Sequence, residues 1–334
     1  MTQAPTISIV IPVYNGGQKF RRCLESIHQL NPQPGQLIVV ADGDTDGSRD
    51  VAAEHGAHVI TTASPGGPAR ARNIGAEAAE GDILFFVDAD VTVHQDAIEI
   101  LQRIFSEEAD TAAVFGSYDD SPSEPNFTSQ FKNLMHHYVH QVSKEEATTF
   151  WGACGAIRRD VFFEVGGFDA ERYGRPCIED IELGYRLTDA GYRIRLCRSL
   201  HVKHLKKWTV VSQIKTDVMD RALPWTKLML ERSDVSSDLN LQWSSRVSTF
   251  LVALLLLLVL VTFIYPIAAV VILAAVIGLV YLNAPLYRFF YEKRGLFFSL
   301  RAILWHWVYY LYSGVAFGVG SFQHTISNLS KQNT

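Results

Sequence analysis

Two aspartates one residue apart end an apolar run, in the sequence Gly81-Asp82-Ile83-Leu84-Phe85-Phe86-Val87-Asp88-Ala89-Asp90. Such a run is typical of a buried parallel strand, and ligands of open α/β sheets bind beyond the carboxyl ends of strands. Strand residues i and i+2 share a face, and hard divalent cations prefer carboxylate oxygens. Asp88 and Asp90 therefore predict a Mg²⁺ or Mn²⁺ site beside a diphosphate. The alternative is a solvated turn whose acids cap a helix.

A second acidic loop, Asp42-Gly43-Asp44-Thr45-Asp46-Gly47-Ser48, follows an apolar run at residues 37–41. The pattern Asp-X-Asp-X-Asp-Gly also begins a calcium-binding EF-hand loop, whose twelfth position is a bidentate Glu. Ala53 occupies that position, and a strand pattern precedes the loop instead of a helix. We therefore interpret Asp42 as an acceptor for nucleobase N–H groups or ribose hydroxyls. A turn built on the backbone preferences of Asp and Gly is the alternative.

A phosphate contact is predicted where a flexible loop, residues 64–68, leads into a helix pattern at residues 69–76. Backbone N–H groups at a helix N-terminus attract anions, and a nearby guanidinium adds charge-assisted hydrogen bonds. We select Arg72 rather than Arg70 for a diphosphate or base contact, and the position relative to Asp88 favours a functional contact. A solvated helix face is the alternative.

Two later stretches complete the predicted cleft. Residues 150–159 are small and glycine-rich, so Gly152 allows close approach of the backbone to a ligand. Residues 177–187 have helical periodicity with acids in the first turn, where the macrodipole favours negative charge. An acid that faces a cleft from that position can act as general base for an acceptor hydroxyl. Glu179 and Asp180 are therefore catalytic candidates, and simple charge complementarity is the alternative.

The elements that must position these residues are strands and helices that alternate from residue 6 to residue 116. This alternation predicts βαβ units with right-handed crossovers and a parallel sheet covered on both faces. Residues 127–142 form a further helix pattern that carries His136 and His140. A His pair at i, i+4 can bind zinc, but no acid or cysteine of suitable spacing joins it. We interpret these histidines as a helix face beside an acceptor cleft.

The composition limits the class of function. The chain has 334 residues, of which 48% are hydrophobic, and its mean hydropathy is +0.08, with the apolar excess after Arg246. A formal net charge of −5 argues against a nucleic-acid partner. The four cysteines lie far apart without a Cys-X-X-Cys spacing, so neither a zinc site nor a disulfide framework is predicted.

Residues 247–282 are almost uninterrupted apolar sequence, too long for one membrane span of about 20 residues. Tyr265-Pro266 divides this stretch, so we predict spans at about 247–264 and 267–287, and a third segment, 296–322, that spans or lies in the interface. Basic residues in the loop after the second span place that loop in the cytoplasm. The N-terminus lacks the pattern of a secretory signal. The prediction is a multi-pass protein of the inner (cytoplasmic) membrane with a cytoplasmic catalytic domain.

Residues 201–246 are predicted to form a basic amphipathic segment at the membrane surface. Lysines, histidines and an arginine alternate there with tryptophans and aliphatic residues. Such a helix beside a span lies on an anionic leaflet, although it can also pack on the catalytic domain. Membrane attachment raises the local concentration of a lipid hydroxyl or lipid phosphate, so we expect a lipid acceptor.

Six motifs in this order resemble the family 2 glycosyltransferases, which are inverting enzymes with the GT-A fold. The motifs are Ser8-Ile9-Val10-Ile11-Pro12-Val13-Tyr14-Asn15, Asp42-Gly43 with Asp46-Gly47-Ser48, Ala71-Arg72-Asn73-Ile74-Gly75, Gly81-Asp82 with Asp88-Ala89-Asp90, Gly166-Gly167-Phe168-Asp169, and Glu179-Asp180. The resemblance implies a GT-A type α/β domain with a mostly parallel sheet, over residues 1–200, that uses a nucleotide-diphospho-sugar donor such as a UDP- or GDP-sugar.

The resemblance also implies roles for single residues. Asp42 contacts the nucleobase, Asp90 ligates a Mg²⁺ or Mn²⁺ ion that bridges the diphosphate, and Asp180 deprotonates the acceptor hydroxyl. The expected donor-binding residues are Pro12, Tyr14, Asn15, Asp42, Arg72, Asp88 and Gly152.

Two departures from the family pattern affect the expected product and donor. Ala41 precedes Asp42 where many members have paired aspartates, so the nucleobase contact rests on Asp42 alone. The Gln-X-X-Arg-Trp motif of processive synthases is absent, which favours transfer of a single sugar over polymer synthesis. The alternatives are a catalytically silent nucleotide-sugar-binding membrane scaffold and a polysaccharide synthase subunit.

Overall fold

The computed structural model describes residues 4–232 and 243–332, which form two compact units, Met1–Lys207 and Trp208–Thr334. The first unit is built on one sheet whose strands are β1 (Ile7–Val13), β2 (Gln36–Asp42), β3 (His58–Thr62), β4 (Ile83–Val87), β5 (Val91–Val93), β6 (Thr111–Tyr118), β7 (Glu146–Ala147), β8 (Cys154–Arg158) and β9 (Arg193–His204). The order across the sheet is β3-β2-β1-β4-β8-β6-β9-β5, and β7 pairs with β9.

The expected parallel sheet is confirmed for its first half. Strands β3, β2, β1 and β4 are all parallel to their neighbours. Beyond β4 the sheet becomes mixed, because β8 pairs antiparallel with both β4 and β6, and β5 pairs antiparallel with β9. Every residue of β4 is buried, as its apolar sequence requires for a strand covered on both faces.

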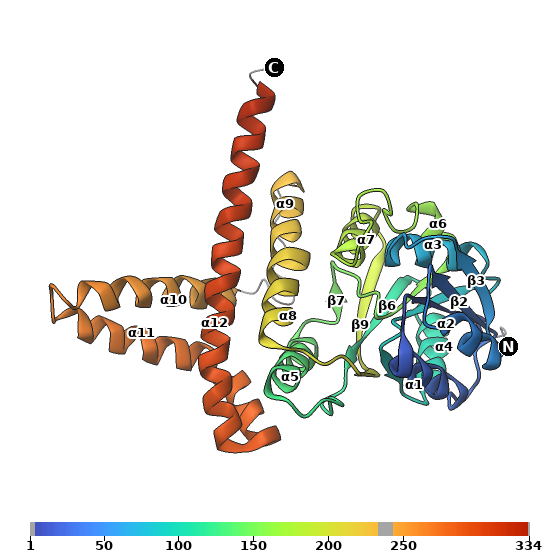
Figure 1. Cartoon of the computed structure of the whole chain (residues 1–334), viewed down its shortest axis with the longest axis horizontal. Helices are drawn as coiled ribbons and strands as arrows, with labels where there is room; N and C mark the ends of the chain where they lie inside the picture. Colours follow the sequence, from blue (N-terminus) through green and yellow to red (C-terminus); the bar gives the residue numbers. More distant parts are fainter. Residues whose placement is uncertain (1–3, 233–242, 333–334) are drawn as a thin grey trace. The chain divides into compact units, whose positions relative to one another are not determined.

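Helices cover both faces of this sheet (Figure 1). One face carries α3 (Pro68–Glu77), α6 (Arg159–Glu164) and α7 (Glu179–Asp189), and the other carries α1 (Gly17–His28), α2 (Ser48–Glu54) and α4 (Ala97–Glu107). The helix predicted over residues 127–142 is observed as α5 (Phe127–Val142). The carboxyl ends of β1, β2 and β4 therefore open at one edge, between the N-termini of the helices that follow them.

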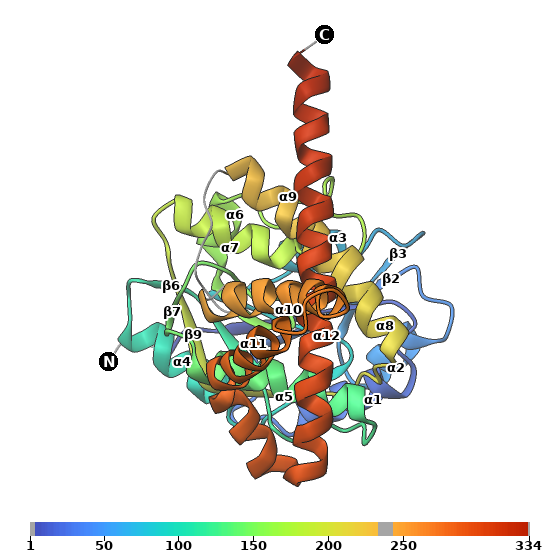
Figure 2. The same cartoon turned by 90° about the vertical axis from the view of Figure 1, so that its left-hand side faces the viewer.

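The second unit contains only helices among its described residues. These are α8 (Val210–Lys215), the π-helix η1 (Thr216–Ala222), α9 (Leu223–Arg232), α10 (Trp243–Val261), α11 (Ala268–Leu282) and α12 (Ala284–Gln332). Helices α10 and α11 lie side by side, and α12 crosses them (Figure 2). Their shared core is formed by Val252, Leu255, Ala275, Leu279 and Tyr310.

The predicted break at Tyr265-Pro266 is confirmed, because α10 ends at Val261 and α11 begins at Ala268. Of the described helices, α10 alone is long and apolar enough to cross a membrane by itself. The pair of α11 and α12 passes the same test only as one broken span, bent by 64°. The second span predicted over residues 267–287 stays a prediction, and the helix in that range ends at Leu282.

The bend between α11 and α12 lies at Asn283, a polar residue buried within the helical unit. Its side chain donates to Ser248 Oγ and Leu279 O, at 3.0 and 2.9 Å, and accepts from Tyr310 Oη at 2.8 Å. The polar network holds the helix ends together, because a buried amide must find hydrogen-bond partners. The third predicted segment, 296–322, lies within α12, beyond a second backbone break at Gly295.

The domain boundary predicted at residue 200 and the start of the amphipathic segment differ from the structure. Strand β9 continues to His204, so residues 201–204 belong to the sheet rather than to an interfacial helix. Residues 210–232 are helical and pack against α12, with hydrogen bonds from Trp305 to Gln213 and from Tyr312 to Asp217. Residues 233–242 of the predicted segment lie outside the described residues.

We expect Gly184→Ala to destabilise the protein, because α7 packs directly on a neighbouring loop. A Cβ at Gly184 would lie 2.3 Å from Phe150 N and 2.5 Å from Thr149 C, both backbone atoms that cannot rotate away. The expected loss is about 1–3 kcal/mol of unfolding free energy from overpacking, against a gain of about 1 kcal/mol from helix propensity. Chemical unfolding of the full chain in detergent measures it.

Gly174→Ala is the matched control, because nothing lies within 4 Å of a Cβ at Gly174. Equal stability of the two variants would contradict the tight packing of α7 against the loop before β8.

Candidate active site

The carboxyl end of β4 places Asp88 and Asp90 at the open edge of the sheet. Both side chains are partly accessible, with exposed fractions of 34% and 33%. The Asp88 backbone is fixed because its N–H donates to Ala153 O and its carbonyl accepts from Val91 N, both at 3.3 Å. The predicted position of the two carboxylates beyond a buried parallel strand is confirmed.

Arg72, in the second turn of α3, joins two of the predicted site acids. Its Nη2 donates to Asp88 Oδ1 at 2.7 Å, and its Nη1 donates to Glu179 Oε1 at 2.9 Å. Only 5% of the Arg72 side chain and 6% of the Glu179 side chain are exposed. One buried guanidinium thus connects the end of β4 to the first turn of α7.

The acids around Arg72 favour its charged form. Burial alone would lower the pKa of Arg72, but Asp88, Glu179 and Asp180 raise it further than burial lowers it. The guanidinium therefore stays protonated, and its planar fork suits two carboxylates at once. With both terminal nitrogens engaged, Arg72 has little surface left for a phosphate, so its predicted diphosphate contact stays a prediction.

Asp180 lies one residue beyond Glu179, in the first turn of α7, and has a different environment. Its Oδ2 accepts a hydrogen bond from Gly152 N at 3.1 Å, and its Oδ1 accepts from Ile181 N at 2.9 Å. The side chain is half-buried, whereas Glu179 is buried and also accepts from Cys177 N at 2.9 Å. The structure thus separates the two predicted catalytic acids, because Glu179 is buried in an ion pair with Arg72, whereas Asp180 is half-buried and accepts hydrogen bonds from backbone N–H groups.

Gly152 adjoins both the bridge and Asp180. A Cβ at this position would lie 3.2 Å from Arg72 Cζ. The glycine therefore leaves room for the close approach of the loop to the guanidinium, a reason that its sequence context did not indicate. Its predicted contact with a ligand stays a prediction.

His204 is a residue of the site that sequence reasoning missed. Its Nε2 lies 3.7 Å from Asp90 Oδ2, and its buried ring stacks on Tyr118 with centroids 4.5 Å apart. Burial would raise the pKa of Asp90, but His204, Lys206 and Lys19 outweigh burial and lower it. The apolar and basic alternation of residues 200–204 is the period-two signal that indicates a strand ending here.

Asp42 is buried at the end of β2 and holds the loop that precedes α3. Its Oδ2 accepts from the N–H groups of Gly66 and Gly67, at 2.8 and 2.9 Å, and its Oδ1 accepts from Thr62 Oγ1 at 2.8 Å. Asp42 thus fixes the approach to Arg72. The nucleobase contact predicted for Asp42 stays a prediction.

The loop after β1 lies against the acidic loop after β2. Asn15 adopts a positive φ of 52° and accepts from Thr45 N at 2.8 Å. Asp46 accepts from Gly17 N at 2.9 Å and from Ser48 Oγ at 2.6 Å. Burial would raise the pKa of Asp46, but these hydrogen bonds outweigh burial and lower it.

The remaining residues predicted for donor binding lie beside these loops. Tyr14 has 57% of its surface exposed, and Pro12 lies in β1 opposite Val40 of β2. The structure thus brings the predicted donor residues of β1 and β2 to the same edge of the sheet as Asp88.

The carboxylate oxygens at the end of β4 suit a hard divalent cation. Among residues 4–232 and 243–332, no group of three or more His, Cys, Asp or Glu side chains could hold a metal ion alone. Mg²⁺, however, is usually held by one or two carboxylates together with substrate phosphates and water. Asp88 and Asp90 supply such a pair of partly exposed carboxylates.

The histidines of α5 hold that helix on the sheet. His137 Nδ1 donates to Tyr118 O at 2.7 Å, and His140 Nδ1 donates to Gly116 O at 3.0 Å. Burial lowers the pKa of His140 to about 4. The rings of His136 and His140 pack on Trp151, with centroids 4.8 and 5.5 Å from it.

We expect Arg72→Met to be severely destabilising, because it leaves Glu179 buried without its cation. Removing one partner of a buried ion pair costs about 3–5 kcal/mol. Chemical unfolding of the full chain in detergent, followed by near-ultraviolet circular dichroism, measures the loss.

Arg70→Met, two positions earlier on the exposed side of α3, is the control and should change stability by less than about 0.5 kcal/mol. Two equal losses would show that the Arg72 bridge does not stabilise the fold.

Comparison with known proteins agrees with this geometry. Residues 8–166 match the family model of glycosyl transferase family 2. The chain is 31% identical over 126 residues to glycosyltransferase GlyG of Streptococcus pneumoniae, an alignment that covers 36% of this chain and 42% of that protein. It is 26% identical over 239 residues to the O-antigen chain rhamnosyltransferase WbaN of Salmonella anatum, which covers 66% of this chain and 74% of the relative.

The fold is similar to that of a solved mannosyltransferase, PcManGT from Pyrobaculum calidifontis, in complex with GDP-Man and Mn²⁺. The TM-score is 0.57 at 14% identity, over 97% of this chain and 88% of the other. The chain spans less than half the length of GlyG. Residues 8–166 of this chain thus match a glycosyl transferase family 2 domain, on a sheet and helices of the GT-A type.

Proposed function

We propose that the protein is an inverting, metal-dependent glycosyltransferase that moves a single sugar from a nucleotide-diphospho-sugar to a membrane lipid. The observation that carries this proposal is the Arg72 bridge, which fixes Asp88 and the first turn of α7 to each other. A pair of metal-binding carboxylates and a candidate general base are thereby held at one edge of the sheet.

Asp180 is the proposed general base. It accepts the proton of the acceptor hydroxyl, whose oxygen then attacks the anomeric carbon of the donor. The bond from that carbon to the diphosphate oxygen breaks, and the nucleoside diphosphate leaves with the electron pair on the opposite face, which inverts the configuration. Gly152 N and Ile181 N orient the Asp180 carboxylate, while Glu179 acts as a positioning residue through Arg72.

Asp88 and Asp90 are the proposed ligands of Mg²⁺ or Mn²⁺. When bound, the cation neutralises the charge that develops on the departing diphosphate. The donor is proposed to lie across the ends of β1 and β2, with contacts from Pro12, Tyr14, Asn15, Asp42 and Gly152. The expected donor is a GDP- or UDP-sugar, and the GDP-Man and Mn²⁺ complex of the mannosyltransferase of similar fold supports a nucleotide-diphospho-sugar with Mn²⁺.

The acceptor is proposed to be a hydroxyl or phosphate of a lipid at the cytoplasmic face of the membrane. The second unit supports this because α10 is an apolar helix of sufficient length to span. Its outward side chains include Phe250, Leu257 and Leu260, which are 58–65% exposed in the protein alone. Such a surface is expected to be covered by hydrocarbon.

We expect the protein in native-like membranes to release nucleoside diphosphate from one donor of a UDP-, GDP- and dTDP-sugar panel. Release should require Mn²⁺ or Mg²⁺ and total lipid extract, with labelled sugar recovered in the lipid fraction. Asp180→Asn should lower the turnover number by about 10²–10⁴-fold while donor binding remains, because only the proton acceptor is lost.

Asp82→Asn is the control, because Asp82 bonds Thr6 at the opposite end of β4. Release that ignores lipid and labels only soluble acceptors would contradict the lipid acceptor. Full activity of Asp180→Asn would contradict the assigned base, and no release from any donor would leave a silent nucleotide-sugar scaffold.

A further inference from the structure

Asp90 and His204 stand at a weakly paired edge of the sheet. Asp90 precedes β5, the last strand in the order, which has three residues and, among the described strands, pairs only with β9. His204 is opposite Val91 in this ladder, and Asp90 O accepts from Leu205 N at 2.9 Å. The position of the Asp90 carboxylate thus depends on how firmly β5 is held against β9.

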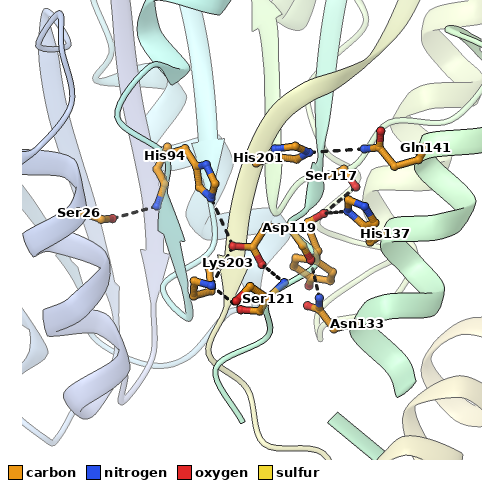
Figure 3. Close-up of polar contacts among 12 residues, drawn as sticks. Ser26, His94, Ser117, Asp119, Ser121, Asn133, His137, Gln141, His201 and Lys203 are labelled. Carbon is orange, nitrogen blue, oxygen red and sulfur yellow. Dashed lines mark hydrogen bonds and ion pairs between the residues drawn. The ribbon is translucent and has the colours of Figure 1, made fainter. Parts of the chain in front are cut away.

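The opposite face of the same strands carries a polar network centred on Asp119, the residue after β6 (Figure 3). Asp119 Oδ2 lies 3.0 Å from Lys203 Nζ and 3.3 Å from His94 Nε2. Asp119 Oδ1 accepts from Ser121 N at 3.0 Å. One carboxylate therefore connects the end of β6, the end of β9 and the residue that follows β5.

Strand alternation separates this network from the site. Thr92 is opposite Lys203, and Tyr118 is opposite Val202 in the neighbouring ladder. Successive side chains of a strand point to opposite faces of the sheet. Lys203 and Asp119 therefore lie on one face, and His204 and Tyr118 lie on the other. Asp119 does not reach the proposed metal ligands itself and acts on them through the backbone.

We propose that Asp119 is a positioning residue for the metal end of the site, which it serves by clamping β5 to β9 through His94 and Lys203. This inference rests on the proposed function of Asp90 as a metal ligand. The contacts of Asp119 join the ends of β5, β6 and β9. Asp90 directly precedes β5, and His204 is the last residue of β9. Without this clamp, the three-residue β5 keeps its backbone ladder to β9 and the hydrogen bonds from Val93 N to Ser26 Oγ at 3.0 Å and from Val91 N to Asp88 O at 3.3 Å.

The electrostatics support a charged clamp. Only 9% of the Asp119 side chain is exposed, and the backbone carbonyl of the same residue accepts from Asn133 Nδ2 at 2.7 Å. Burial would raise the pKa of Asp119, but His94 and Lys203 outweigh it and lower this pKa. Hydrogen bonds to an ionised partner are shorter and about twice as strong as neutral ones, so loss of the charge should loosen the edge strand.

The test is binding of Mn²⁺ to the purified full chain in the presence of UDP or GDP, which supplies the phosphates that complete the site, measured from the electron paramagnetic resonance signal of free Mn²⁺ and compared with nucleotide alone. Asp119→Asn keeps the shape but removes the charge, and should raise the dissociation constant about 10-fold, as for loss of a group that orients a metal ligand. Lys203→Met should have a similar effect, and Lys203→Arg should restore near wild-type affinity. These changes do not depend on knowing the donor or acceptor.

Asp82→Asn is the matched control, because Asp82 also accepts two hydrogen bonds across strands, at 2.8 and 2.7 Å, but far from Asp90. It should lower the thermal midpoint without changing Mn²⁺ affinity. The inference would be overturned if Asp119→Asn bound Mn²⁺ as tightly as the wild type, or if Asp82→Asn lost as much Mn²⁺ affinity as Asp119→Asn. Either result would leave the proposed metal site standing. Absence of Mn²⁺ binding by the wild type would overturn the metal site of the proposed function, and the inference with it.

Discussion

The site depends on one buried guanidinium. Arg72 pairs with Asp88 at the end of β4 and with Glu179 at the start of α7, residues that are 16 and 107 positions away in the chain. A buried ion pair offsets its desolvation only when its geometry is good and its remaining polar atoms are satisfied. Glu179 meets this condition because Cys177 N binds its second oxygen. The bridge thus fixes where Asp180 lies relative to Asp88.

The rest of the first unit supports that bridge from both sides. Asp42 fastens the loop before α3 through Gly66 and Gly67 and so sets the approach of the helix that carries Arg72. Gly152 lets the loop before β8 lie against the guanidinium and offers its N–H to Asp180. The acids of the site therefore form two groups. Glu179 and Asp42 are buried and hold the structure in place. The partly accessible acids, which can contact a ligand, are Asp88, Asp90 and Asp180.

Local patterns in the sequence were sufficient to predict β1, β2, β4 and α5, and to place Asp88 and Asp90 beyond β4. Partners distant in sequence were not predictable, because no local pattern pairs Arg72 with Glu179. The end of strand β9 is difficult to predict because its basic residues continue into the basic residues that follow, so His201 and Lys203 fall within the predicted amphipathic segment. The bend at Asn283 depends on contacts with Ser248 and Tyr310, which only the folded helices bring together.

A double-mutant cycle between Arg72 and Glu179 tests the central claim most directly. The unfolding free energies of Arg72→Met, Glu179→Met and the double variant are measured on the full chain in detergent. If the bridge holds β4 to α7, the double variant should lose about 2 kcal/mol less than the two single losses combined, since removal of both charges leaves neither unpaired. Single losses that add to within about 0.5 kcal/mol would contradict the account.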